Sequence, residues 1–280
     1  MPGQIKRILV LGASGKVGRL LRLAWDRNPP DGVALILQSR RDVGIHWQPG
    51  LPNPFGHVDV VIALWGVTHG SDAELSANTS LSLQAQTLAI ECGATRVLHC
   101  SSVAVYAPKD GLLSEEDPTG SLNPYGHAKL QMERALATAE GPARTILRIG
   151  SVAGAESLAS AVQRGWQGDA EMLQLDRFPD GKGPARSYIA PSDLADVLIG
   201  LATCSTDLPA VLNVGAPSPV HMEGLLAAAD HPFAWKTAPE AARQYAVMDC
   251  TRLCALTGLS SAAADPAHIM TDWLALEGRV

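Results

Sequence analysis

The chain has 280 residues, of which 46% are hydrophobic and 18% are charged. That is enough to bury a substantial core, either as one large domain or as a main domain with a smaller lobe. A formal net charge of -6 without a basic stripe gives no electrostatic reason to expect nucleic acid as a partner. No apolar run approaches the roughly 20 residues that cross a bilayer, and no small-residue cleavage site follows the short apolar segment near the start, so we expect a cytoplasmic protein without a membrane partner.

In chain order, short apolar runs alternate with helical patterns over the first 150 residues. Strands are expected at 7–12, 33–38, 45–47, 58–65, 96–102 and 144–150, and helices at 17–26, 80–91 and 124–139. Continuous apolar strands separated by helices predict a parallel sheet that is covered on both faces. The predicted fold class is therefore α/β and doubly wound, with ligands at the carboxyl ends of the strands.

The pattern becomes less regular after about residue 155. We assign residues 1–155 and about 186–215 to the sheet domain, which is also the expected nucleotide-binding domain. About 156–185 and 216–280 are assigned to a small C-terminal substrate-binding lobe.

The first turn, GASGKVG, lies between the first strand and the first helix. Gly12 allows a tight turn, Gly15 allows close approach of a pyrophosphate to the backbone, and Gly18 allows close helix packing. Helix N-terminal amides are donors for anionic oxygens. An isolated glycine triplet can be a tight turn without a ligand, but its position after a strand and before a helix favours a dinucleotide site. The predicted site also includes Ser14, Lys16 and Val17.

The end of the second strand indicates which dinucleotide binds. A carboxylate there would accept the adenosine ribose 2′-OH, but this chain has Gln38, Ser39, Arg40 and Arg41. Arginine pairs well with a 2′-phosphate. We therefore favour NADP over NAD, with Ser39 and Arg40 as contacts. The alternative is that the arginines are solvated loop charges.

A helix that begins at NPYGHAK carries the predicted acid/base group. Asn123 is a suitable N-cap and Pro124 a suitable first residue, which places Tyr125 and Lys129 four residues apart on one face. A phenol titrates near pH 10, and a neighbouring ammonium favours the phenolate. Tyr125 is predicted to exchange a proton while hydride moves to or from nicotinamide, and Lys129 to hold the cofactor ribose. The alternative is a helical tyrosine beside a surface lysine.

Two serines, Ser101 and Ser102, end the strand at 96–102. A hydroxyl at this position can donate to a substrate carbonyl and stabilise charge on its oxygen in the transition state. The alternative is a serine pair that caps a turn.

With these residues the chain resembles the extended short-chain dehydrogenase/reductases, the NAD-dependent epimerase/dehydratase family, over nearly its whole length. The resemblance implies a Rossmann-type fold and catalytic roles for Ser102, Tyr125 and Lys129. It also implies that Ala63, Leu64 and Asn78 lie along the cofactor.

The same resemblance suggests where substrate binds. Arg186, in DGKGPARSYIAPSDLAD, matches an arginine that meets substrate phosphate in the nucleotide-sugar enzymes of the family. Two departures weaken the case for such a substrate: Ser151 replaces an asparagine that is often found after the sixth strand, and Ser187 replaces an aspartate. Trp65, at the end of the fourth predicted strand, is a further predicted substrate contact.

These residues favour a reductase or dehydrogenase that transfers hydride between nicotinamide and a small carbonyl/alcohol substrate. The alternative reaction is epimerisation of a nucleotide sugar with retained NAD. Dehydration is discounted because Val103 and Ala104 stand where a dehydratase would carry an Asp-Glu pair. An alternative of another class is a non-catalytic NADP-sensing protein. The sequence leaves the oligomeric state open; a homodimer is one alternative, because related enzymes are often dimers.

Cysteine usage adds no further site. The five cysteines are odd in number and scattered, which argues against a disulfide framework: Cys92, Cys100, Cys204, Cys250 and Cys254. Cys250 and Cys254 are spaced to share a helix face; we expect them to be buried structural thiols, and we expect no bound metal.

Overall fold

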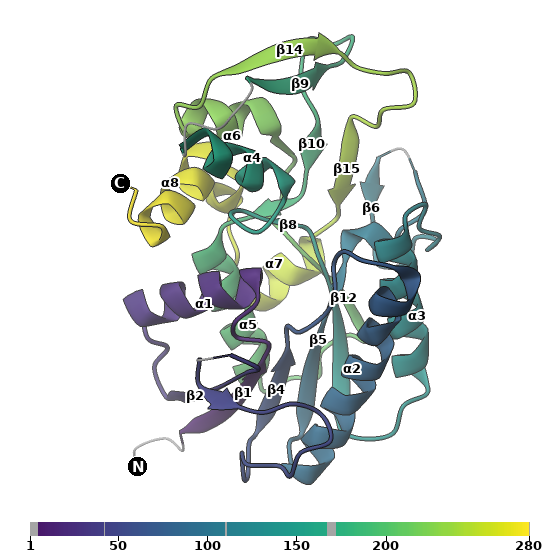
Figure 1. The fold of residues 1–280 in the computed structure, drawn as a ribbon, viewed down its shortest axis with the longest axis vertical. Coiled ribbons are helices and arrows are strands. Elements are labelled where there is room, and N and C mark those ends of the chain that lie inside the picture. The colour runs from purple at the N-terminus through teal and green to yellow at the C-terminus, as the bar shows by residue number, and fades with distance from the viewer. Residues whose placement is uncertain (1–4, 42, 110, 167–171, 280) are drawn as a thin grey trace.

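A seven-stranded parallel sheet forms the centre of the protein in a computed structural model, which describes residues 5–41, 43–109, 111–166 and 172–279 (Figure 1). Its spatial order is β12 (Val211–Val214), β7 (Ala143–Ile149), β5 (Arg96–Ser102), β4 (Val60–Ala63), β1 (Lys6–Leu11), β2 (Val33–Ser39) and β3 (Ile45–His46). Every neighbouring pair in this sheet is parallel. The predicted doubly wound α/β fold is confirmed.

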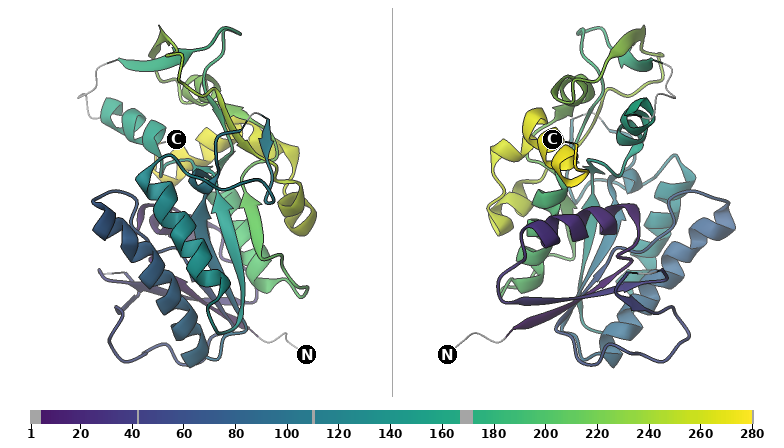
Figure 2. Two further views of the ribbon diagram at one scale, coloured as in Figure 1. Left: turned by 90° about the vertical axis from the view of Figure 1, so that its right-hand side faces the viewer. Right: turned by 60° about the vertical axis from the view of Figure 1, so that its left-hand side comes forward.

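Helices cover both faces of this sheet because successive side chains of its strands face opposite ways. On one side, Ile8 and Val10 of β1 share a core with Leu21 of α1 (Lys16–Arg27) and Leu198 of α5 (Pro191–Thr203). On the other side, the alternate residues of β1 pack with α2 (Asp72–Glu91). Next to α2 runs α3 (Pro124–Ala137), and the two helices lie side by side in the left view of Figure 2.

The winding reverses between β1 and β4, because the chain runs outward through β2 and β3 and then returns to the other side of β1. Loops that follow the two central strands leave in different directions at such a point, which opens a place for a ligand at the carboxyl edge. The glycine turn follows β1 and therefore lies at this edge.

Helix α2 begins earlier than the predicted 80–91. Ser71 and Glu74 form a capping box, in which the Ser71 hydroxyl accepts from the Glu74 amide at 3.3 Å and the Glu74 carboxylate accepts from the Ser71 amide at 2.8 Å. This cap satisfies first-turn amides that would otherwise lack a partner, so the helix starts at Asp72.

The lobe lies above the sheet in Figure 1 and is built largely from the second half of the chain. Its helices are α4 (Ser157–Trp166), α6 (Met222–Ala228) and α8 (Pro266–Leu276). Its strand pairs are β8 (Ser151–Val152) with β11 (Tyr188–Ile189), and β9 (Leu173–Arg177) with β14 (Phe233–Thr237). A further sheet has the order β13 (Val220–His221), β10 (Ala185–Arg186), β15 (Tyr245–Met248) and β6 (Leu112–Leu113).

Two connections cross between the sheet domain and the lobe. Strand β6 lies within the segment that the sequence assigned to the sheet domain, yet it pairs with β15. Conversely, α7 (Thr251–Thr257) contacts β12 and α5 although it lies within the segment assigned to the lobe. Short 3-10 helices at Val103–Val105 and Ser261–Ala264 complete the elements of the described chain.

Across the described residues, none of the helices combines the length and the apolarity that crossing a membrane requires. The same part of the chain holds no group of three or more His, Cys, Asp or Glu side chains placed to bind a metal ion. All five cysteines are free thiols.

Candidate active site

The glycine turn is so closely packed that side chains would not fit at two of its positions. Gly12 has φ +87°, and a Cβ there would lie 2.7 Å from the backbone nitrogen of Trp65. A Cβ on Gly18 would lie 2.5 Å from the Gly12 carbonyl oxygen. At the open side, Gly15 is the N-cap of α1 and is exposed together with Lys16. The turn therefore has the form of a cradle that admits an anion to the first amides of α1.

Gln38 holds this turn in place, a role that the sequence analysis missed. Its buried side chain accepts from the Gly12 amide at 2.9 Å and donates to the Trp47 carbonyl at 2.5 Å. The clue in the sequence is an amide at the end of an apolar strand, where a buried polar group must find partners.

The rest of the β2 end is divided between a buried serine and an exposed arginine. The Ser39 hydroxyl donates to the Arg41 carbonyl at 2.8 Å and accepts from the Arg41 amide at 3.0 Å. Ser39 is buried, whereas Arg40 and Arg41 are exposed. Of the two predicted contacts to a 2′-phosphate, Arg40 is therefore the accessible one.

The loop after β4 connects the glycine turn to the predicted catalytic helix. Leu64 donates its amide to the carbonyl of Leu11 at 3.0 Å, and Ala63 is buried in the strand. Two residues further, a Cβ on Gly66 would lie 2.7 Å from Asn78 Oδ1 and 3.3 Å from Lys129 Nζ.

The side chain of Asn78, on α2, holds the loop after β4 by hydrogen bonds to its backbone. Its Oδ1 accepts from the Val67 amide at 3.2 Å, and its Nδ2 donates to the carbonyls of Val67 and Leu75 at 2.8 and 2.9 Å. The buried amide thus bonds to backbone groups on α2 and in the loop.

Ser102 and Tyr125 are brought together where α3 begins. Asn123 caps the helix by accepting from the Gly126 amide at 2.7 Å. A Cβ on Gly126 would lie 2.1 Å from the Ala104 carbonyl oxygen, so this end of α3 packs directly on the chain that follows β5. Burial raises the pKa of Tyr125, and hydrogen bonding with the Ser102 hydroxyl opposes that rise.

Lys129 lies one turn further along α3 and is only 4% exposed. Its Nζ donates to the Cys100 carbonyl at 2.8 Å. Burial lowers the pKa of Lys129 to about 8, against the opposing charge of groups such as Glu133. Burial is the largest influence on the Tyr125 phenol and raises its pKa, and the effect of the Lys129 ammonium on the phenolate stays a prediction.

A buried polar network stands behind these residues. Ser101 donates its hydroxyl to Glu133, and Arg148 donates to the same carboxylate at 2.8 Å. The guanidinium lies 4.6 Å from the centre of the Tyr106 ring, and the Tyr106 hydroxyl donates to Asn213 at 2.6 Å. Of the two strand-end serines, Ser101 is part of the core, whereas the Ser102 hydroxyl accepts from the Ala104 amide at 3.2 Å and caps the 3-10 turn that follows β5.

Arg186 lies on β10 with its guanidinium fixed by backbone carbonyls. It donates to Ala185 and Gln244 at 2.7 Å each and to Arg243 at 3.3 Å. Among the described residues, no carboxylate oxygen lies within 4.0 Å of it. Burial lowers its pKa. A half-buried guanidinium of this kind retains positive charge and can bind an anion.

Ser151 and Trp65, the other residues predicted for the substrate site, lie on different parts of the fold. Ser151 is half-buried in β8 and donates its amide to the Ser187 carbonyl at 2.8 Å. The Ser187 hydroxyl is buried and accepts from the Met248 amide at 2.8 Å, so serine in this position serves the core. Trp65 stacks on Trp47, which follows β3, with ring centres 6.2 Å apart. It therefore lies on the β2–β3 side of the turn.

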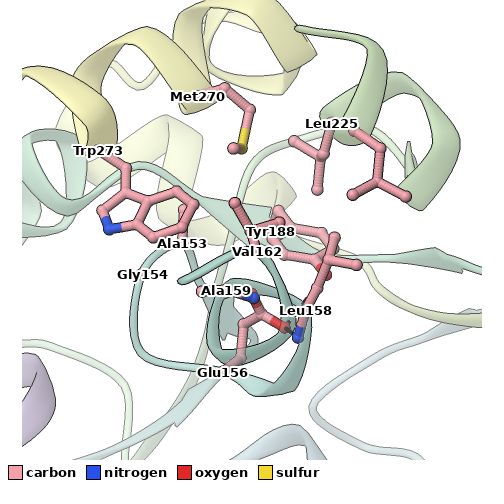
Figure 3. A pocket seen from close by; sticks show the side chains of 11 residues that line it. Ala153, Gly154, Glu156, Leu158, Ala159, Val162, Tyr188, Leu225, Met270 and Trp273 are labelled. Carbon is pink, nitrogen blue, oxygen red and sulfur yellow. Dashed lines mark hydrogen bonds between the residues drawn. The ribbon is translucent and has the colours of Figure 1, made fainter. Parts of the chain in front are cut away.

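Figure 3 shows a small cavity next to β8, lined by α4 and α8, that the sequence analysis did not predict. Its volume of about 10 Å3 admits at most a water molecule. Glu156 lies against it and caps α4, accepting from the amides of Leu158 and Ala159 at 2.5 and 2.8 Å. Burial raises the pKa of Glu156, but its bonds are those of a helix cap.

Comparison with known proteins places these features in a family. A sequence model of the NAD dependent epimerase/dehydratase family matches residues 8–215. UDP-glucose 4-epimerase of Azospirillum brasilense is 40% identical over 83 residues, which are 28% of this chain and 24% of that protein.

Solved structures share the fold over almost the whole chain. UDP-glucuronic acid 4-epimerase from Bacillus cereus, in complex with a UDP-sugar analogue and NAD, superposes with a TM-score of 0.77 at 14% identity, covering 98% of this chain and 100% of that one. An NAD dependent NDP-hexosamine 5,6-dehydratase, TunA, superposes with a TM-score of 0.75 at 20% identity, covering 98% of each chain.

Proposed function

Because this chain belongs to the NAD dependent epimerase/dehydratase family of enzymes, we propose that it is an NAD(P)-dependent oxidoreductase acting on a carbonyl/alcohol substrate. The observation that carries the proposal is the packing of the start of α3, which bears Tyr125, directly on the chain that follows Ser102 at the carboxyl edge of the sheet, with Lys129 buried one turn further. The loop at Gly66 connects that group to the glycine turn.

The turn suits a dinucleotide because neighbouring backbone packs closely on Gly12 and Gly18, which keeps the turn tight and leaves Gly15 exposed at the start of α1. Gly15 and the first amides of α1 would hold the pyrophosphate. When bound, the nicotinamide supplies or accepts the hydride.

In this proposal, the Tyr125 hydroxyl gives its proton to the substrate oxygen during reduction and takes it back during oxidation. Ser102 donates a hydrogen bond to the same oxygen as charge develops there. Lys129 holds the cofactor ribose and places a positive charge behind the tyrosine, which favours the phenolate.

Substitution of Tyr125 by phenylalanine tests the mechanism, because it removes the proton donor and keeps the ring. Turnover is followed by dinucleotide absorbance with a panel of aldehydes, ketones and alcohols. We expect Tyr125→Phe to lower kcat by about 100- to 10,000-fold, with little change in cofactor affinity. Tyr245→Phe is the matched control, since Tyr245 is exposed on β15. Unchanged turnover in Tyr125→Phe would remove this residue from the mechanism.

For the cofactor we propose NADP rather than NAD. The support is the exposed Arg40 at the end of β2, in a run from Gln38 to Arg41 that contains no carboxylate. Calorimetric titration with NADPH and NADH, on wild type and Arg40→Ala, tests this. We expect tighter binding of NADPH and a loss of about 10- to 100-fold in Arg40→Ala, with NADH unaffected. The control is Arg27→Ala, which removes an arginine from the C-terminal end of α1, the end away from the glycine turn. Tighter binding of NADH would assign NAD instead.

A second candidate is epimerisation of a nucleotide sugar with retained NAD. It is favoured by Arg186, whose half-buried guanidinium suits a diphosphate, and by the epimerases among the similar proteins. An epimerase needs no net exchange of oxidised for reduced cofactor. Conversion of UDP-glucose to UDP-galactose by purified protein without added dinucleotide would establish this candidate over the reductase.

A further inference from the structure

Trp65 is fixed on one face by a stack of aromatic rings. Trp47 lies 6.2 Å away with 22° between the two ring planes, and Phe55 packs edge-on against Trp47 at 5.6 Å. Trp47 is 4% exposed, and its indole nitrogen donates to the carbonyls of Leu51 and Pro52, each at 3.1 Å. Trp65 itself is half-buried. It is therefore the outermost ring of the stack, with one face packed on Trp47 and the rest partly accessible to solvent.

The stack and the glycine turn are built as one unit. The backbone of Trp65 fills the space beside Gly12 that a side chain would need. Gln38 joins the same two parts from the other direction, since it bonds to the amide of Gly12 and to the carbonyl of Trp47. A ligand anchored at the turn is therefore held at a fixed distance from the aromatic stack.

The stack also lies on a definite side of the turn. Ser102 and Tyr125 come from β5 and α3. Trp65 follows β4, the neighbour of β5, but stacks on Trp47, which follows the edge strand β3 beyond β1 and β2. A dinucleotide whose pyrophosphate rests on the turn directs its adenosine ribose toward the end of β2. Its nicotinamide half must then extend toward Tyr125, and its purine toward the side on which Trp65 stacks.

We propose that Trp65, backed by Trp47, is the stacking surface for the purine ring of the dinucleotide. This inference rests on the proposed function and moves Trp65 from the predicted substrate contacts to the cofactor. An indole suits the task, because a purine stacks on its face with little dependence on base identity. The Trp65 indole nitrogen is buried and has no hydrogen-bond partner within the described residues, so the ring is not tied down by its polar edge.

The experiment separates the two halves of the cofactor. ADP-ribose and nicotinamide mononucleotide are titrated calorimetrically against wild type, Trp65→Ala and Trp65→Phe. We expect Trp65→Ala to bind ADP-ribose about 10- to 100-fold more weakly. The mononucleotide should bind equally to all three proteins, and Trp65→Phe should retain most of the ADP-ribose affinity because it keeps a ring.

Trp235→Ala is the matched control for loss of an indole, since Trp235 is 37% exposed on β14, in the lobe. Equal or tighter binding of ADP-ribose by Trp65→Ala would overturn the inference, and tighter binding would show that the indole fills the space of the base. An equal loss for both half-molecules would overturn it too. If Trp65→Ala does not fold, weak binding of ADP-ribose by a folded Trp65→Leu supports the inference and unchanged binding overturns it.

These results are distinguishable from failure of the proposed function. If ADP-ribose affinity is insensitive to Trp65 while wild type still turns over with the dinucleotide, only the stacking inference fails. If wild type binds neither half-molecule nor the intact dinucleotide, the proposed function fails and the inference fails with it.

Discussion

At the scale of single residues, Lys129 carries a charge in a place where burial disfavours it. The unfolded chain keeps this proton up to the ordinary pKa of 10.5, whereas the folded protein releases it at about 8. Between these values the unfolded chain binds more protons, so the free energy of unfolding contributed by Lys129 rises with pH. Below about pH 8 the penalty for the buried ammonium is present in full.

Lys129→Met should remove this dependence. Between pH 8 and above pH 10, the unfolding free energy of wild type should rise relative to that of the variant. The expected rise is on the order of 3 kcal/mol. Urea unfolding of both proteins across that range measures it. The Cys100 thiol also changes the stability over this range, because burial raises its pKa from 9.0 to about 12, but both proteins carry it and its contribution cancels in the difference between them. A difference that stays constant with pH would contradict the expectation.

The sequence identifies which residues gather at the site better than it identifies their contacts. Ser102, Tyr125 and Lys129 converge because strand ends and helix starts meet at one edge of a parallel sheet, which spacing alone predicts. The direction of the Lys129 ammonium toward a carbonyl, and of Trp65 toward Trp47, depends on partners that are distant in sequence. Neither can be read from local pattern.

At the scale of elements, α1 is held against the glycine turn by the absence of a side chain at Gly18. In Gly18→Ala the new Cβ would meet the backbone of Gly12 and Ala13 at 2.5 and 2.8 Å, and backbone cannot move aside without displacing the helix. We expect a loss of about 1–3 kcal/mol in unfolding free energy and weaker dinucleotide binding.

The same substitution at another glycine, Gly200→Ala, should raise the unfolding free energy instead of lowering it. Gly200 is an exposed residue inside α5, and a Cβ there would meet no atom within 4 Å. Alanine should stabilise the helix by about 0.5–1 kcal/mol. Thermal unfolding of both variants tests the pair, and a stabilising Gly18→Ala would refute the close packing of α1 on the turn.

Elements of the main sheet are predictable because each one carries its own apolar run, bounded by turn residues. The start of α2 was missed since its first two turns lack such a run, and only the Ser71–Glu74 cap marks it. The lobe is harder for a different reason: β9 at Leu173–Arg177 pairs with β14 at Phe233–Thr237, and nothing in either segment specifies a partner that far away.

At the scale of the whole molecule, a buried network ties α3 to the connection with the lobe. It runs from Glu133 on α3 through Arg148 on β7 and Tyr106 to Asn213 on β12. Asn213 then donates to the carbonyls of Leu113 and Asp249 at 2.9 and 3.0 Å, in the segments that carry β6 and β15. The members of this network are one another's hydrogen-bond partners, so the loss of one side chain leaves another without a partner.

A double-mutant cycle on Glu133 and Arg148 measures how much the network contributes. Both side chains are 7% exposed, and Glu133→Gln or Arg148→Met alone leaves a buried charge unpaired, so each should lower the unfolding free energy by about 3–5 kcal/mol. The double variant removes both charges and should lose clearly less than the sum, with a coupling energy above about 1 kcal/mol. Lys109 and Asp117 provide the control cycle: their 2.6 Å pair is about as short, but the lysine is 44% exposed, and its coupling should be about 0.2–1 kcal/mol. Because solvent screens the control pair and not the buried one, equal couplings in urea unfolding would mean that the network does not hold α3 to the connection with the lobe.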